Sequence, residues 1–405
     1  MLFTRGVEAI AAPYDLRCLR CQQTAVDPLP SFCDSCGAMI DVRYPLQRVS
    51  LHTSSNPYRR FAELLPIGDA SLLPQSSQPT PTHHARRLGE HLKLPSLYLK
   101  NETVLPTGTT KDRMAAVSLA YLWERGIRTF TTSSTGNSSS SYATSIANFP
   151  DMRVLIFTAE RFVARVSFVP SSQVVHFGLR EATFVEAARC AERYARCHDL
   201  YFEPGFFNPG RREGLKLAFL EASEQVPTPI DWYVQAVSSA MGVFGAYKGA
   251  RELLEMHRID KLPRLLCVQQ ESCAPMVRGF EAGAPTLGPE HLVARPAGIA
   301  EAILRGDPTR AYPYVRQIVQ DSGGSMASVS ESQIREAQNL LQRLEGITAC
   351  FASAAALAGA IKLTASGVLP RHDTILVNLT GRDRPPAASP IRWLRKHQDD
   401  WLEEA

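Results

Sequence analysis

Short apolar runs alternate with longer stretches of helical periodicity from about residue 97 to residue 379. The β-prone runs predict strands at residues 97–100, 129–133, 154–158, 174–177, 232–237, 265–269 and 374–379. Apolar positions that repeat every three to four residues predict helices at residues 112–125, 185–197, 211–225, 241–257, 331–344 and 352–366. Because strands in alternation with helices form mostly parallel sheets covered on both faces, the chain is predicted to have an α/β fold.

Two segments lack this regular alternation. Residues 44–84 are rich in Pro, Ser and Thr without sustained periodicity, and they predict a connector that wraps around the body of the protein. Residues 392–404 form an amphipathic tail with Trp393 and Trp401. The tail is expected to pack on its own domain or on a partner subunit, and the pattern does not choose between them.

Small polar residues follow three of the predicted strands, where ligands of parallel sheets collect, and the least informative of the three is Thr380-Gly381 after the strand at 374–379. The strand at 129–133 is followed by Ser134, Thr135, Gly136, Asn137 and Ser138 and then by a predicted helix at 142–148. Free backbone N–H groups at such a helix start suit a carboxylate or phosphate, although an exposed serine-rich loop is the alternative. The strand at 232–237 is followed by a second, weaker candidate anion site, which comprises Ser238, Ser239, Ala240, Met241 and Gly242.

Lys111 lies where an extended segment breaks at Pro106 and Gly108 and a helix begins. The positive end of the helix dipole and the nearby apolar residues both disfavour an ammonium charge there, so the pKa of Lys111 is expected to be lowered. A lysine of this kind can form a Schiff base with a carbonyl cofactor. The alternative is an ordinary lysine near a helix N-terminus.

Composition narrows the class of protein. A chain of 405 residues with 44% hydrophobic content can bury a large core and predicts two or three domains. The 44 basic and 40 acidic residues nearly balance, which argues against nucleic-acid binding and favours small-molecule chemistry. No run approaches the length of a membrane helix and the first ten residues lack a signal-like apolar core, so a cytoplasmic protein is expected.

Four of the nine cysteines form two C-x2-C pairs, Cys18 with Cys21 and Cys33 with Cys36. Four thiolates close one tetrahedral zinc site and leave no position for a substrate, so the zinc is predicted to be structural. Four reduced thiols or a redox pair are the alternatives. A disulfide framework is not expected in so long a chain.

Together these segments resemble the threonine synthase group of fold-type II pyridoxal-phosphate (PLP) enzymes, from Cys18 to about Arg384. The motifs are Pro106-Thr-Gly-Thr-Thr-Lys-Asp-Arg113, Ser134-Thr-Gly-Asn-Ser138, Asn208-Pro-Gly-Arg-Arg-Glu-Gly214, Ala274-Pro-Met-Val-Arg-Gly-Phe-Glu281, Ser322-Gly-Gly324 and Leu379-Thr-Gly381. The resemblance implies a tryptophan synthase β-like fold with two open twisted α/β domains. A zinc-ribbon-like module would span residues 1–45, a large PLP-binding domain residues 46–110 and 215–405, and a smaller domain with the substrate-carboxylate loop residues 111–214.

The resemblance also implies roles for individual residues. Lys111 would hold PLP as a Schiff base, and the cofactor would be bound by Asn137, Ser238, Ser239, Ala240, Met241, Gly242 and Thr380. The substrate would be bound by Ser134, Thr135, Gly136, Ser138 and Arg211, with the Arg211 guanidinium facing a leaving phosphate. A hydroxyl such as Thr380 at the pyridine nitrogen favours elimination or replacement over transamination. A homodimer is expected from the same resemblance.

The sequence departs from threonine synthases at several of these positions. Phe206 stands where they have a phosphate-binding serine, and Cys350 where they have a glutamate. Arg382-Asp-Arg384 replaces small residues, and Ser238–Gly242 resembles the corresponding loop of cysteate synthase.

Three functions follow from the resemblance. The first is threonine synthase-like conversion of O-phosphohomoserine to threonine and phosphate. The second is cysteate synthase-like replacement on O-phosphoserine with sulfite or another nucleophile, as in specialised amino-acid biosynthesis. The third is a catalytically silent regulatory or binding relative. The incoming nucleophile and the activated amino acid are left open.

Overall fold

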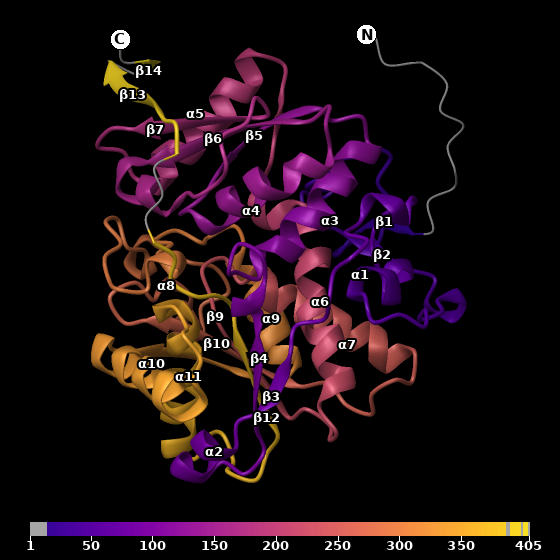
Figure 1. Cartoon of the computed structure of the whole chain (residues 1–405), viewed down its shortest axis with the longest axis vertical. Helices are drawn as coiled ribbons and strands as arrows, with labels where there is room; N and C mark the ends of the chain where they lie inside the picture. Colours follow the sequence, from indigo (N-terminus) through magenta and orange to yellow (C-terminus); the bar gives the residue numbers. More distant parts are fainter. Residues whose placement is uncertain (1–13, 386–388, 398–399, 404–405) are drawn as a thin grey trace.

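The computed structural model describes residues 14–385, 389–397 and 400–403, and it contains the predicted α/β arrangement (Figure 1). All seven predicted strands and the six helices of the alternating region are present, with ends within two residues of the predicted ones. The predicted helix at 142–148 instead begins earlier, as α4 (Asn137–Ser145). The reason is that Gly136 turns the backbone sharply and lets the following serines enter the helix.

The first of two six-stranded sheets has the order β11-β10-β9-β12-β4-β3. Its strands are β3 (Thr82–His84), β4 (Leu97–Asn101), β9 (Trp232–Ala236), β10 (Arg264–Gln270), β11 (Ser325–Val329) and β12 (Ile375–Leu379). Only β3 is antiparallel to its neighbour. Side chains of β9 alternate between two cores, since Trp232 and Val234 lie in one and Tyr233 in the other. Both faces of the sheet are therefore covered.

The second sheet has the order β14-β13-β7-β6-β5-β8. Its strands are β5 (Thr129–Ser133), β6 (Arg153–Ala159), β7 (Val174–Leu179), β8 (Tyr201–Phe202), β13 (Arg392–His397) and β14 (Asp400–Glu403). The predicted domain division placed residues 215–405 together in the large PLP-binding domain, but the two C-terminal strands belong to the second sheet. They join β7 because Trp393 lies over Gly178 and stacks at 3.6 Å on the Arg180 guanidinium. The boundaries at residues 45, 110 and 214 stay a prediction.

Helices flank both sheets. They are α1 (Pro57–Arg60), α2 (Arg86–Leu92), α3 (Lys111–Glu124), α4 (Asn137–Ser145), α5 (Phe184–Cys197), α6 (Pro209–Gln225), α7 (Met241–Glu255), α8 (Pro275–Glu281), α9 (Tyr312–Asp321), α10 (Glu331–Glu345) and α11 (Phe351–Ala365). Helices α10 and α11 lie on one side of the first sheet, whereas α6 and α7 lie on the other (Figure 1). No helix in the described ranges has the length and apolar character needed to cross a membrane.

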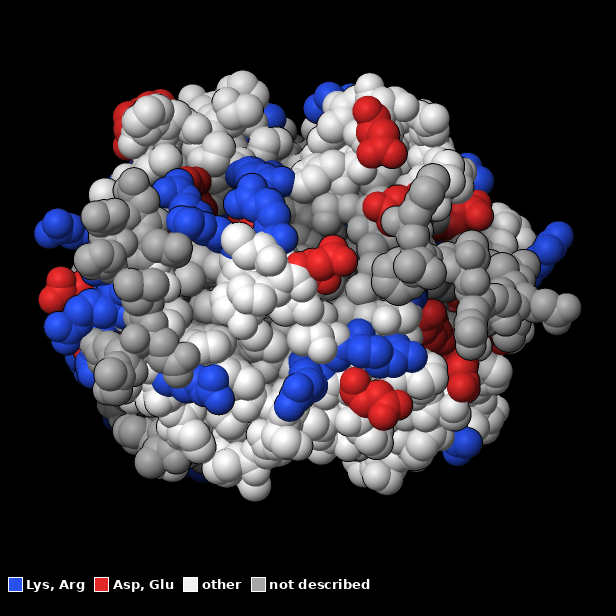
Figure 2. All heavy atoms as spheres, turned by 90° about the horizontal axis from the view of Figure 1, so that it is seen from above, with Lys and Arg blue, Asp and Glu red and all other residues white. Residues whose placement is uncertain are grey.

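The segment predicted to be a connector, residues 44–84, contains α1 and the edge strand β3 as well as three short 3-10 turns. These elements could not be predicted from the polar sequence, because an edge strand and single helical turns need little apolar periodicity. Asn56 caps α1 through its side chain, and β3 pairs with β4. On the face seen in Figure 2, basic and acidic side chains are interspersed, in keeping with the nearly balanced charge.

Candidate active site

A cavity lies at the carboxyl ends of β5, β9 and β12, next to the start of α3. Most of the residues predicted to form a site line it, although they come from distant parts of the sequence: Lys111, Ser134, Thr135, Asn137, Ser138, Arg211, Ser238, Ser239, Ala240, Met241, Gly242 and Thr380. Gly136 is not on the wall. The other lining residues include Phe206 and Arg305, and the lining contains no Asp or Glu.

Lys111 is the first residue of α3, and its half-buried side chain reaches the cavity. The peptide before it is fixed to the strand end opposite, because Thr110 N–H donates to Thr380 O at 2.9 Å. Burial, with a smaller contribution from the positive charge of Arg211, lowers the pKa of Lys111 to about 8. The amine therefore has a substantial neutral fraction near physiological pH.

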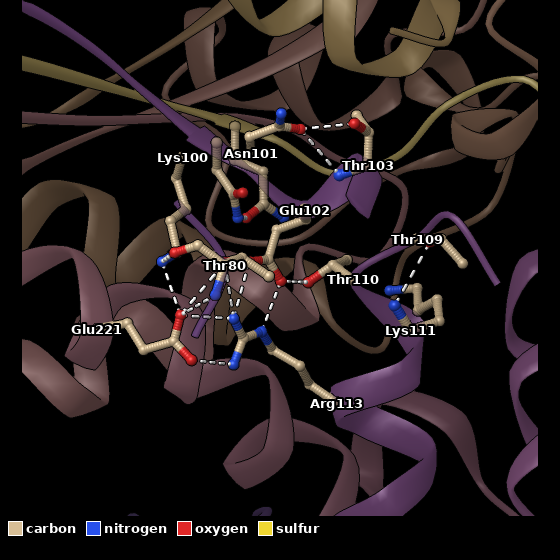
Figure 3. Close-up of polar contacts among 12 residues, drawn as sticks. Thr80, Lys100, Asn101, Glu102, Thr103, Thr109, Thr110, Lys111, Arg113 and Glu221 are labelled. Atoms are coloured by element: carbon tan, nitrogen blue, oxygen red, sulfur yellow. Dashed lines mark hydrogen bonds and ion pairs between the residues drawn. The ribbon is translucent and has the colours of Figure 1, made fainter. Parts of the chain in front are cut away.

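A buried polar network holds the start of α3 in place (Figure 3). Glu102 accepts hydrogen bonds from Thr110 Oγ1 at 3.1 Å and from Arg113 Nε at 2.6 Å, one residue before and two residues after Lys111. Arg113 Nη1 in turn donates to Glu221 at 2.7 Å on α6. Because the side chains of Glu102, Arg113 and Glu221 are at most 3% exposed, these ion pairs restrict the first turn of α3 and with it Lys111.

The turn from Ser134 to Ser138 is stabilised from within. Ser134 Oγ accepts hydrogen bonds from the N–H groups of Gly136 and Ser139, each at 3.1 Å. Gly136 has φ +118°, and an added Cβ would lie 2.6 Å from Arg165 Cβ, so only glycine fits there. The hydroxyl of Ser134 is thus occupied in shaping the turn, which presents Thr135, Asn137 and Ser138 to the cavity.

The second turn, from Ser238 to Gly242, leads into α7. Ala240 has φ +62°, a left-handed conformation that bends the chain immediately before the helix. Within the described residues, the N–H groups of Ala240, Met241 and Gly242 donate to no protein acceptor. An added Cβ at Gly242 would lie 2.4 Å from the Gln235 side chain. These free amides at a helix N-terminus fit the phosphate of PLP.

Thr380 lies on the cavity wall at the end of β12. The next residue, Gly381, is held on both sides by Ser353 on α11, whose hydroxyl donates to Gly381 O at 2.7 Å and accepts from Gly381 N–H at 2.9 Å. Cys350 does not line the cavity; its Sγ lies 3.5 Å from Ser353 Oγ, and burial raises the pKa of its thiol. Phe206, in contrast, is buried on the cavity wall.

Arg211 also lines the cavity, but other side chains of the protein engage it. It forms a buried ion pair with Glu203, and its remaining donors lie 3.2 Å from Thr132 Oγ1, 3.2 Å from the Tyr142 hydroxyl and 3.4 Å from Ser138 Oγ. The charge of Arg211 is therefore balanced within the protein.

Two arginines near the cavity were missed by the sequence analysis. Arg384 Nη2 donates to Asn137 Oδ1 at 2.6 Å, which fixes the orientation of the Asn137 amide. Arg305 lines the cavity from the loop after the 3-10 turn η9 (Glu301–Ile303). Arg305 follows no predicted strand, and Arg384, five residues after the strand at 374–379, was noted only as a departure from the family's motif, so the three-dimensional structure is needed to place both near the site.

The four N-terminal cysteines lie together beside strands β1 (Asp15–Cys18) and β2 (Ile40–Arg43). Their four Sγ atoms all lie within 4.8 Å of one another, and this cluster could hold a metal ion. Arg212 on α6 fixes the module to the body of the protein, because it donates to Ile40 O at 2.8 Å and to Asp41 at 2.9 Å.

The chain matches the family described as "Pyridoxal-phosphate dependent enzyme" over residues 73–381. Threonine synthase of Methanosarcina acetivorans is 31% identical to it over 379 residues, covering 91% of each chain. Cysteate synthase of Methanospirillum hungatei is 25% identical over 382 residues, covering 91% of this chain and 89% of the relative.

Solved structures with the same fold include processed threonine deaminase isoform 2 from Solanum lycopersicum, with a TM-score of 0.61 at 18% identity. Maize serine racemase superimposes with a TM-score of 0.62 at 17% identity. The matches cover 76% of this chain in both cases, and 84% and 89% of the respective solved chains. The α/β architecture predicted from the sequence is therefore confirmed as that of fold-type II PLP enzymes.

Proposed function

Because the chain belongs to the pyridoxal-phosphate dependent enzyme family, we propose that it uses PLP at Lys111 for elimination or replacement on an O-phospho amino acid. The strongest support is that one cavity contains both the Lys111 amine, whose pKa is lowered, and the turn Ser238–Gly242, whose backbone amides are free to bind a phosphate. Threonine synthase-like formation of threonine and phosphate from O-phosphohomoserine is the leading function, since threonine synthases are among the relatives with the highest identity.

Each predicted site residue has a role in this proposal. Lys111 is the attachment point of the cofactor and the catalytic amine. The cofactor is bound by Asn137, Ser238, Ser239, Ala240, Met241, Gly242 and Thr380. The substrate is bound by Ser134, Thr135, Gly136, Ser138 and Arg211, with Ser134 and Gly136 acting through the shape of their turn.

Bound PLP supplies an electron sink for the substrate's α-carbon. Lys111 Nζ is the group that removes the α-proton, and a pKa of about 8 leaves enough free amine to do so near neutral pH. A neutral hydroxyl such as that of Thr380 beside the ring of bound PLP would favour elimination or replacement over transamination. Phe206 contributes an apolar wall that helps to exclude water from the reacting centre.

A cysteate synthase-like replacement on O-phosphoserine is the second candidate. It is favoured by Phe206, which lines the cavity where threonine synthases have a phosphate-binding serine and therefore offers no hydroxyl there. It is also favoured by the similarity to cysteate synthase of Methanospirillum hungatei. The proposal also includes a structural zinc ion at Cys18, Cys21, Cys33 and Cys36. A homodimer stays a prediction.

Phosphate release separates the two candidates. The purified holoenzyme is incubated with O-phospho-L-homoserine or with O-phospho-L-serine, with and without sulfite, and Lys111→Ala is the control. Release from O-phospho-L-homoserine with threonine as product is expected for the leading function. Sulfite-dependent release from O-phospho-L-serine alone would favour the second, and release from neither substrate would contradict both.

A further inference from the structure

Arg305 is a cation on the cavity wall, and no carboxylate of the described residues forms an ion pair with it. Its Nε donates to Asp307 O at 3.2 Å, and its guanidinium lies 5.6 Å from the centroid of the Phe184 ring. In the described part of the chain it forms no ion pair within 4.0 Å, and its two terminal nitrogens donate to no protein acceptor. Such a guanidinium fork is suited to a bidentate anion.

Arg211, the arginine that the sequence analysis assigned to the substrate anion, is in the opposite situation. Its ion pair with Glu203 lies inside the protein, where the two side chains are 3% and 0% exposed. Its other donors face Thr132, Tyr142 and Ser138, so few of its five N–H groups remain for a ligand. A negative ligand group therefore gains less from Arg211 than from an arginine without a partner.

The charges of the residues that line the cavity also favour an anion at Arg305. The lining contains three cations, Lys111, Arg211 and Arg305, and no carboxylate. Burial lowers the pKa of Arg305, and the charges of Arg310 and Arg211 lower it further, against the opposing effect of Asp307. No carboxylate among the described lining residues therefore neutralises Arg305, and a dianionic group of a ligand would do so.

We propose that Arg305 is the specificity-determining residue for the phosphate group of the substrate, which it binds through its two terminal nitrogens. In place of the substrate contact that the proposed function gave it, Arg211 then serves as a positioning residue that links Glu203 to the turn at Ser138. This assignment rests on the proposed function, because it presumes an amino acid with a phosphate on its side chain.

Spectral titration of the holoenzyme tests the assignment, with each spectrum recorded by rapid mixing before the phosphorylated amino acids turn over. Binding of O-phospho-L-homoserine and O-phospho-L-serine is compared with binding of L-homoserine and L-serine, which lack the phosphate, and inorganic phosphate serves as the competitor. The variants are Arg305→Gln, Arg305→Lys and, as the matched control, Arg310→Gln. Arg310 does not line the cavity; it stacks on Phe32 and Phe207 at 4.6 and 4.9 Å.

For Arg305→Gln we expect the Kd of both phosphorylated amino acids to rise by about tenfold or more, with the unphosphorylated ones within about twofold of wild type. Inorganic phosphate should lose its ability to compete. Arg305→Lys should recover part of the loss, and Arg310→Gln should behave as wild type.

Three results would overturn the assignment. An unchanged Kd for the phosphorylated amino acids in Arg305→Gln would overturn it while the proposed function stands. An equal loss for phosphorylated and unphosphorylated amino acids would show that Arg305 acts on the shared part of the molecule or on the fold. Failure of the wild-type enzyme to bind either phosphorylated amino acid would instead refute the proposed function, and this inference with it.

Discussion

Replacement of Lys111 by methionine is expected to stabilise the cofactor-free protein at neutral pH. In the folded protein the pKa of Lys111 is about 8, whereas its ordinary value is 10.5. Below pH 8 the lysine is protonated in both states, so the folded protein bears the full cost of the buried charge. A difference of roughly 2.5 pKa units corresponds to about 3 kcal/mol, which is an upper value because the side chain is only half-buried.

The sign of the pH dependence follows from the same numbers. Between about pH 8 and pH 10.5 the unfolded lysine keeps its proton while the folded one loses it, so the stability of the wild type rises with pH. The advantage of Lys111→Met should therefore shrink by about 2 kcal/mol between pH 7 and about pH 9.5. Groups that titrate in both proteins cancel in this difference.

Urea unfolding of the cofactor-free proteins, followed by circular dichroism at both pH values, measures the effect. Lys93→Met removes an exposed ammonium and is the matched control, for which the difference from wild type should stay within about 0.5 kcal/mol. If Lys111→Met were no more stable than wild type at pH 7, or if its advantage did not shrink with pH, the lowered pKa of Lys111 would be refuted.

Two further predictions concern the buried ion pair of Arg211 and the N-terminal cysteine cluster. Arg211→Gln leaves the Glu203 carboxylate buried without its cation, so the free energy of unfolding should fall by about 3–5 kcal/mol. The control Arg335→Gln breaks an exposed ion pair and should lower the free energy of unfolding by less than about 1 kcal/mol. Equal losses for the two variants in urea unfolding would contradict this prediction. Elemental analysis under reducing conditions should find near-stoichiometric zinc in the wild type and much less in Cys33→Ser. A wild type with neither zinc nor iron would refute the metal site.

The alternating part of the fold could be predicted because burial on both faces of a parallel sheet demands continuous apolar strands. Strand β11 was missed for a physical reason. The sequence of β11, Ser-Met-Ala-Ser-Val, has one β-branched residue and little local strand preference. It becomes a strand because β10 offers a free edge with parallel register and because α11 packs against it. Such tertiary context is not visible in a local pattern.

The candidate site divides in the same way. Lys111 and the two small polar turns could be predicted because each follows a strand or begins a helix, where the local sequence determines the backbone. Arg305 could not, since its loop is far in the sequence from the strands that end at the cavity, and Arg384 could not, since it contacts Asn137 only once the two sheets have come together. Arg211 lines the cavity, but its buried partner Glu203 lies eight residues earlier, and no sequence spacing predicts that ion pair.

Covalent attachment of PLP to Lys111 is the claim on which the catalytic account depends. Borohydride reduction of the holoenzyme, followed by peptide mass mapping, tests it directly. The account predicts a reduced pyridoxyl group on Lys111 and none on Lys100 or Lys216, which are fully buried in ion pairs. An unmodified Lys111 in a fully loaded and active protein would contradict it.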